Sequence, residues 1–152
     1  MFSSEDYDKL ISNKPLIKGE YIFIYSPWSN EKVYEMACAL KKKYNKRIVI
    51  SQGLRSKHEM LKWGGEFKIY AAVGPKEFLN LCKNAFIVCC DSFHAVVFSI
   101  LFKKCFFVLN GMDDNRISNL LRITNLENRS FSFSDDYLSA PCLLYTSDAA
   151  DD

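Results

Sequence analysis

The sequence predicts an α/β domain of the Rossmann-like type, in which helices cover both faces of a parallel sheet to give three layers. Three observations lead to this expectation. The 152 residues suit a single domain. Apolar runs rich in β-branched and aromatic residues alternate with helical patterns at the spacing of βαβ units. These runs are apolar on both faces, as strands of a covered parallel sheet are.

The predicted strands are short and end at residues that break regular structure. Tyr21–Tyr25 stops at Ser26-Pro27, Gly74-Pro75 follows the third run, and a loop is predicted from Gly53 to Gly65. We expect five strands, at residues 21–25, 47–51, 67–72, 86–90 and 105–109. Right-handed crossovers between consecutive strands then give the parallel sheet.

Helices are predicted between the strands from apolar residues at helical spacing. Their apolar positions are, in order, Val33, Met36, Ala37 and Leu40; Phe78, Leu79 and Cys82; and Ile117, Leu120, Leu121 and Thr124. Ser29 or Asn30 is expected to cap the first helix, Pro75 opens the second, and Asp113 or Asp114 caps the last.

The composition is that of a globular chain and excludes several classes of protein. The apolar fraction is 49% and the charged fraction 25%, so the chain is not disordered. A net charge of +2 gives no argument for nucleic-acid binding. No apolar run reaches the ~18–20 residues of a membrane span, and the first 20 residues lack the order of a signal peptide. We therefore expect no nucleic-acid partner and no transmembrane segment, and the cysteines, considered next, predict a cytoplasmic protein.

The six cysteines favour reduced core residues over a metal site. No two of them have C-x-x-C spacing, and the two histidines do not complete a set of ligands. Cys82, Cys89, Cys90 and Cys105 stand inside apolar runs, where a thiol behaves as a small hydrophobe. The sequence thus predicts neither a metal nor a cofactor.

The most informative candidate site follows the strand at 86–90. Ligands of open parallel sheets bind beyond the carboxyl ends of the strands, and Asp91-Ser92-Phe93-His94 stands at such an end. Ser92 is expected to cap the next helix, 94–102, which has scarcely a polar residue and is predicted to be buried. The first turn of that helix favours an anion, and His94 adds a group that titrates near neutral pH. The alternative is that His94 hydrogen-bonds to backbone inside the core.

Other candidate residues lie at the same edge of the predicted sheet. Gly74 and Pro75 open a helix after the third strand, and Arg116 follows the last strand, where it either clamps an anion or balances neighbouring aspartates. Trp28 and Trp63 either stack on a sugar ring or pack against the protein.

Short motifs follow one another in a fixed order from residue 74 to residue 129. They are Gly74-Pro-Lys-Glu-Phe-Leu79, Asn84-Ala85, Asp91-Ser-Phe-His94, Phe98-Ser-Ile100, Asn115-Arg-Ile117, Leu120-Leu121, and Asn125-Leu126 with Arg129. In order and spacing they resemble the C-terminal half of polysaccharide pyruvyl transferase family proteins. Two positions depart from the family pattern: Ser92 stands where better-known members carry Arg, and Ala95 where Gly is usual.

The resemblance implies half of an architecture similar to the GT-B glycosyltransferases, and it implies the domain limits. Residues 1–20 would be an inter-domain linker with a short helix, 21–135 the Rossmann-like C-terminal domain, and 136–152 a non-native or disordered tail. Residues 142–152 resemble the translation of a sequencing adaptor. The expectation is therefore a fragment that lacks the N-terminal domain of the same protein and is inactive alone.

The resemblance also implies an activity, the transfer of a pyruvyl group from phosphoenolpyruvate to hydroxyls of a cell-surface polysaccharide. His94 would be the motif histidine, which contacts the donor or acts as general acid. Ser92, Phe93, Gly74, Pro75 and Arg116 would help to bind substrate. Two alternatives stay open: the nucleotide-sugar-binding half of a GT-B glycosyltransferase, and a non-catalytic α/β binding module.

Overall fold

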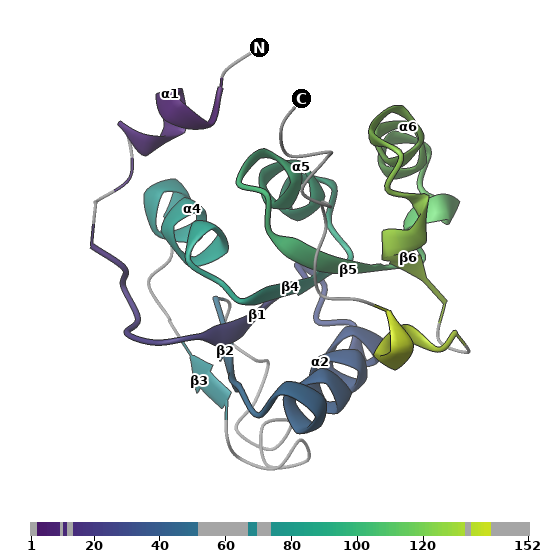
Figure 1. Cartoon of the computed structure of the whole chain (residues 1–152), viewed down its shortest axis with the longest axis horizontal. Helices are drawn as coiled ribbons and strands as arrows, with labels where there is room; N and C mark the ends of the chain where they lie inside the picture. Colours follow the sequence, from purple (N-terminus) through teal and green to yellow (C-terminus); the bar gives the residue numbers. More distant parts are fainter. Residues whose placement is uncertain are drawn as a thin grey trace.

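The computed structural model describes residues 3–9, 11, 14–51, 67–69, 74–132 and 135–140, and it is shown in Figure 1. Six parallel strands form one sheet in the order β3-β2-β1-β4-β5-β6. The strands are β1 (Tyr21–Tyr25), β2 (Arg47–Ile50), β3 (Phe67–Ile69), β4 (Ile87–Cys90), β5 (Cys105–Leu109) and β6 (Ser130–Phe131). The helices are α1 (Ser4–Asp8), α2 (Glu31–Tyr44), α4 (Pro75–Lys83), α5 (Phe93–Leu101) and α6 (Asn115–Thr124), with 3₁₀ turns η1 (Gly111–Asp113), η2 (Glu127–Arg129) and η3 (Tyr137–Ser139).

The strand order is the Rossmann order, and it fixes where a ligand is expected. The chain winds outward from β1 to β3, returns to place β4 beside β1, and winds outward again to β6. The order of strands reverses between β1 and β4, and at such a point the crevice beyond the carboxyl ends opens. The five predicted strands are present. The count of five was too low, because β6 is only two residues long and too short to show a periodicity.

Each face of the sheet has its own core. Tyr21 and Phe23 of β1 point into the core that α4, α5 and α6 cover, while Ile22 and Ile24 point into the core that α2 covers (Figure 1). This alternation follows from the two-residue period of a strand. The Tyr21 hydroxyl is buried and donates a 2.6 Å hydrogen bond to the carbonyl of Leu81 in α4, which ties sheet to helix.

Most of the predicted helix boundaries are confirmed by the capping geometry. The Asn30 side chain accepts from the Lys32 amide at the start of α2, and Asp114 accepts from the first amides of α6. Pro75 occupies the first turn of α4. Ser92 stands at the N-cap of α5, but the prediction that it caps the helix is wrong, because its hydroxyl makes no capping hydrogen bond.

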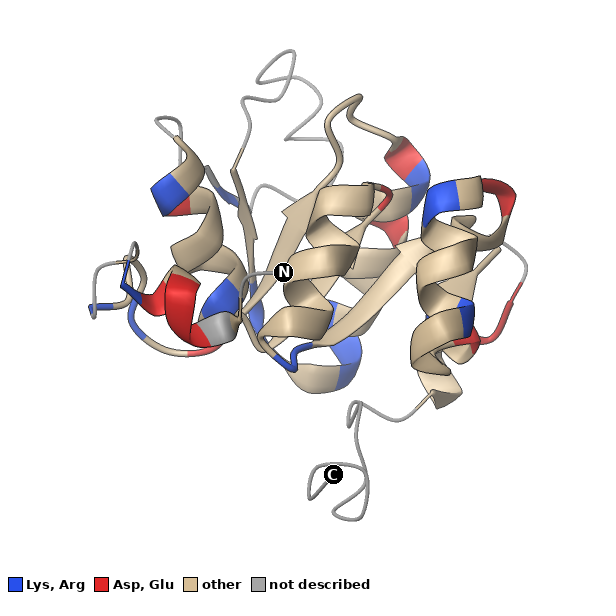
Figure 2. Cartoon of the chain, turned by 90° about the horizontal axis from the view of Figure 1, so that it is seen from above, with Lys and Arg blue, Asp and Glu red and all other residues tan. Residues whose placement is uncertain are grey.

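Helix α5 is less buried than its apolar sequence predicts. Only Ala95, Val96 and Ser99 are fully buried, because α4 and α6 flank the helix and leave its outer side partly open. Figure 2 shows no charged residue along α5, and Tyr7 of α1 covers part of it with an edge contact to Phe98, with ring centroids 5.1 Å apart. Among the described helices, none has both the length and the hydropathy to cross a bilayer.

The segments before and after the sheet also pack on it. Ile17, in the predicted linker, belongs to the core under α4, and α1 begins with a capping box formed by Ser3 and Asp6. Residues 136–140, the first part of the predicted tail, include η3, and Tyr137 packs on the α2 side of the sheet. The adaptor-like segment and the predicted loop from Gly53 to Gly65 lie outside the described residues.

The prediction that the four cysteines in the apolar runs are core residues is confirmed. Cys82, Cys89, Cys90 and Cys105 are buried with free thiols. Burial raises the pKa of Cys82 to about 12 and raises those of Cys89 and Cys90 further, because desolvation disfavours the thiolate.

Candidate functional site

The two strand ends at the switch point are joined by a hydrogen bond. The Ser26 hydroxyl, directly after β1, donates to Asp91 Oδ2, directly after β4, over 3.1 Å. The same hydroxyl accepts from the backbone amide of Asn30 at 2.9 Å. One serine therefore fixes the β1–α2 turn to the segment that leads into α5.

Asp91 is an unusual carboxylate because half of it has no partner in the protein. Its Oδ1 is buried and makes no hydrogen bond, while Oδ2 accepts from Ser26. Burial raises the pKa of Asp91, and hydrogen bonds from the Ser26 hydroxyl, the backbone of Asp91 itself and the Asn30 side chain only partly offset this effect. This carboxyl therefore takes up a proton more readily than a surface aspartate does.

His94 is exposed at the start of α5, so the alternative of a histidine inside the core is excluded. It is the second residue of the helix, and its ring lies 6.1 Å from that of Phe93. Because Ser92 does not cap the helix, its side chain leaves the first-turn amides free to meet a ligand. Amides and helix dipole favour an anion beside a group that can carry a proton.

Arg116 lies beside this histidine turn. Its guanidinium carbon is 5.1 Å from the centroid of the Phe93 ring, the geometry of a cation–π contact. Asp114 holds the same guanidinium, with Nη2 3.4 Å from Oδ2, while its Oδ1 accepts from the Ile117 amide. That amide, with help from Arg116, lowers the pKa of Asp114. The structure thus brings three predicted site residues together: Phe93, His94 and Arg116.

Gly74 and Pro75 lie at the same edge but belong to a different helix start. The Gly74 carbonyl accepts from the Phe78 amide at 3.0 Å, and the Phe78 ring is 4.6 Å from that of Tyr25 at the end of β1. Within the described part of the chain, no hydrogen bond or ring contact joins Gly74 or Pro75 to the histidine turn. Glu77 bends back so far that a Cβ on Gly74 would meet its Oε2 at 2.9 Å. This carboxylate occupies the start of α4 and leaves α5 as the better seat for an anion.

Sequence reasoning singled out both strand-end segments but missed the link between them. The signal was present, since a serine follows the first strand, an aspartate follows the fourth, and these strands are neighbours in a Rossmann sheet. Trp28, for which stacking and packing both stayed open, is 82% exposed. Trp63 and His58 lie outside the described residues. Among the residues described, no group of three or more His, Cys, Asp or Glu side chains could hold a metal ion.

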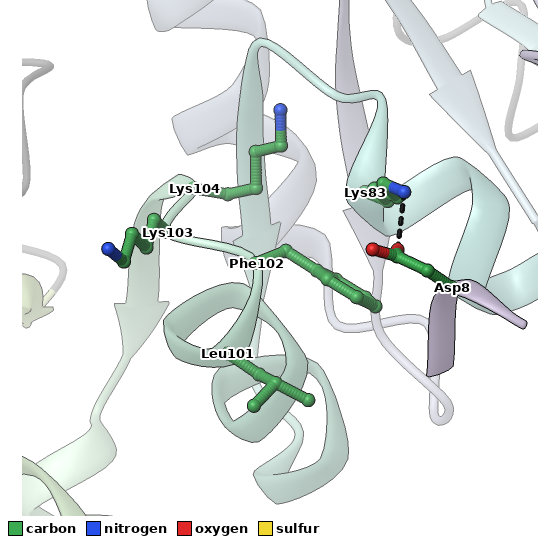
Figure 3. Close-up of a pocket in the computed structure, with 6 residues that line it drawn as sticks. All are labelled: Asp8, Lys83, Leu101, Phe102, Lys103 and Lys104. Carbon is green, nitrogen blue, oxygen red and sulfur yellow. Dashed lines mark hydrogen bonds and ion pairs between the residues drawn. The ribbon is translucent and has the colours of Figure 1, made fainter. Parts of the chain in front are cut away.

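A cavity of about 340 Å³ lies at the opposite edge of the sheet (Figure 3). It is lined by Asp8, Lys83, Leu101, Phe102, Lys103 and Lys104. Lys83 pairs with Asp8, and Figure 3 shows the ammonium groups of Lys103 and Lys104 pointing in different directions. Three lysines that do not converge make a poor anion seat, so we place the candidate site at the carboxyl edge.

Comparison with a family model gives a match over most of the chain. Residues 3–113 match the model described as polysaccharide pyruvyl transferase. The matched span contains His94 and ends three residues before Arg116. A search of proteins of curated function finds no match.

Two solved structures of one archaeal enzyme resemble the fold. The UDP-GlcNAc 2-epimerase of Methanocaldococcus jannaschii is 19% identical with a TM-score of 0.54, over 84% of this chain and 38% of that chain. Its complex with UDP-GlcNAc and UDP is 16% identical with a TM-score of 0.50, over 84% of this chain and 36% of that chain. The chain thus spans little more than a third of these neighbours, and the likeness confirms the predicted α/β Rossmann-like fold.

Proposed function

Because the chain belongs to the polysaccharide pyruvyl transferase family, we propose that its carboxyl edge binds phosphoenolpyruvate and supports transfer of the pyruvyl group to vicinal hydroxyls of a cell-surface polysaccharide. The observation that carries this proposal is the exposed His94 at the start of α5, where no side chain caps the helix. The Arg116 guanidinium lies over the neighbouring Phe93 ring. Family membership implies the glycan acceptor. The donor and the residue roles are our inference.

The donor is a small dianion or trianion without a ring, and the site offers matching charge. The first-turn amides of α5 suit its phosphate, because the free amides at a helix N-terminus commonly bind phosphate groups. The Arg116 guanidinium, which Asp114 and Phe93 keep in place, suits its carboxylate or phosphate through paired N–H groups. Ser92 replaces the arginine of better-known members, so Arg116 supplies the positive side chain in this chain.

The chemistry has two bond-forming steps. A proton is added to the methylene carbon of the donor, and a first acceptor hydroxyl bonds to the adjacent carbon, so that the double bond becomes a methyl-bearing tetrahedral centre. A second, vicinal hydroxyl then displaces the phosphate and closes the ketal, and its proton leaves with the phosphate. His94 delivers the first proton and recovers one from the attacking hydroxyl, the work of a general acid and base.

The same proposal places the protein in the cytoplasm. The proposal is supported by the use of cysteines as buried small hydrophobes, which is typical of a reducing compartment.

Binding measurements test the donor assignment. We expect phosphoenolpyruvate to shift the backbone amide signals of Phe93 to Val96 in heteronuclear NMR spectra, and Arg116→Ala to weaken binding about tenfold. Arg122→Ala, an exposed arginine on the same helix, is the matched control and should leave binding unchanged. If uridine diphosphate moves these amides and phosphoenolpyruvate does not, the site belongs to a nucleotide-sugar enzyme instead.

Turnover tests the role of His94. In the full enzyme, with a polysaccharide acceptor and phosphate release as the readout, His94→Ala should lower kcat by about 100-fold or more. Because the side chain is exposed, the free energy of unfolding should stay within about 0.5 kcal/mol of wild type. Unchanged kinetics would remove His94 from the mechanism.

A further inference from the structure

The turn between β1 and α2 presents a tryptophan to solvent. Trp28 is 82% exposed. It lies in the tight turn Ser26–Ser29, which is closed by a 2.9 Å hydrogen bond from the Ser29 amide to the Ser26 carbonyl. Large aromatic side chains are rarely so exposed, because burying one removes 150–250 Å² of mostly apolar surface from water.

The backbone of this turn is strained and held in place. Ser29 has φ of +54°, a left-handed conformation that is uncommon for a residue other than glycine, asparagine or aspartate. The Ser26 hydroxyl accepts from the Asn30 amide and donates to Asp91, so bonds from both sides maintain the conformation. Strain that is held in this way concentrates at ligand-binding positions.

The turn also lies next to the histidine turn. Strands β1 and β4 are paired, with Tyr25 opposite Cys90, so their carboxyl ends are about 5 Å apart. The next residue of each strand takes part in the Ser26–Asp91 hydrogen bond, and His94 follows Asp91 by three residues. A ligand seated on Trp28 therefore lies at the same edge as the proposed donor seat.

We propose that Trp28 is the stacking platform for a sugar ring of the acceptor. The flat indole face matches the apolar C–H face of a pyranose and leaves the hydroxyls of the ring free at its rim. Phosphoenolpyruvate has no ring, so the partner of the indole is the acceptor and not the donor. This inference rests on the proposed function, and it adds that Asp91 and Ser26 are positioning residues for the acceptor subsite.

The test observes Trp28 directly. In ¹⁵N-labelled protein, the indole N–H signal that Trp28→Phe removes belongs to Trp28. We expect methyl β-galactopyranoside or methyl α-mannopyranoside to move this signal in a saturable way at about 50 mM, well above the ~1 mM dissociation constants of weak ligands. Both variants lack the indole signal, so their binding is followed by the backbone amide signals of residues 26–30. Trp28→Ala should weaken glycoside binding about fivefold or more, and Trp28→Phe should retain most of it.

Controls separate this inference from the donor assignment. Ile123→Ala removes an equally exposed apolar side chain, 81% exposed, from α6 and should change nothing. Trp28→Ala should leave phosphoenolpyruvate binding within about twofold of wild type. Glycosides that move the signal without any phosphoenolpyruvate binding would retain the sugar platform and overturn only the donor. A signal that no glycoside moves, or that uridine monophosphate moves alone, would overturn the platform itself.

Discussion

Replacement of Ser26 by alanine tests the link between the two halves of the sheet. The side chain is 5% exposed and makes two hydrogen bonds, one from the Asn30 amide at 2.9 Å and one to Asp91 at 3.1 Å. A neutral hydrogen bond contributes about 1 kcal/mol and one to a charged group about 1.5–3 kcal/mol. We expect Ser26→Ala to lower the free energy of unfolding by about 3 kcal/mol at pH 7, measured by urea denaturation.

The pH dependence identifies the carboxylate as the partner. Burial raises the pKa of Asp91 above its unfolded-state value, so the folded protein binds the proton more tightly and becomes less stable as pH rises through this range. Asp91→Asn has no proton to lose at this position. The free energy of unfolding of this variant, relative to that of wild type, should therefore increase from about pH 4 to pH 7. In this background Ser26→Ala should cost only about 1–2 kcal/mol, because no charged acceptor remains. Equal costs in both backgrounds, or a cost below about 0.5 kcal/mol at pH 7 in the otherwise wild-type chain, would refute the reasoning.

Three further predictions concern the core. Arg129 is 2% exposed and lies over an aromatic ring of β5, so Arg129→Ala should destabilise the fold by about 3 kcal/mol in urea denaturation, against less than about 0.5 kcal/mol for the exposed Arg122→Ala. Tyr21→Phe deletes the donor of a buried hydrogen bond, so the midpoint of urea unfolding should fall by an amount equivalent to about 1 kcal/mol. Of the described cysteines, the half-buried Cys38 should react first with iodoacetamide at pH 8, as mapped by peptide mass spectrometry; faster labelling of a β4 cysteine would contradict the burial.

Sequence patterns predicted most of the fold because its strands are strong local signals. Tyr21–Tyr25 and the cysteine-rich β4 are buried on both faces of the sheet, and Pro27 closely follows the first of them. Two of the failures come from tertiary context. Ser130–Phe131 forms β6 only because β5 offers an edge to pair with, and α5 is apolar without being enclosed.

The location of the candidate site in the sheet could be predicted from the sequence, whereas most of its side-chain contacts could not. The rule that ligands meet the carboxyl ends of strands led to His94 and Arg116, and the structure adds that Phe93 lies between them. Hydrogen bonds across the sheet leave no local pattern, so the Ser26–Asp91 pair required the strand order. The failure of Ser92 to cap is likewise a matter of side-chain orientation, which composition does not encode.

The adjacency of β1 and β4 also governs when the site comes into existence during folding. Ser26 and Asp91 are 65 positions apart along the chain, whereas β1 with β2 and β4 with β5 are each brought together by a single crossover. Contacts between residues far apart in sequence form slowly, because the entropy of closing a long loop is lost before the contacts can stabilise the fold. We therefore expect the pairing of β1 with β4, beside which the candidate site lies, to form later than the pairings within each half of the sheet. Ligand binding at the candidate site therefore reports that β1 and β4 have paired. A partly folded chain in which each half of the sheet has formed separately would not bind a ligand there.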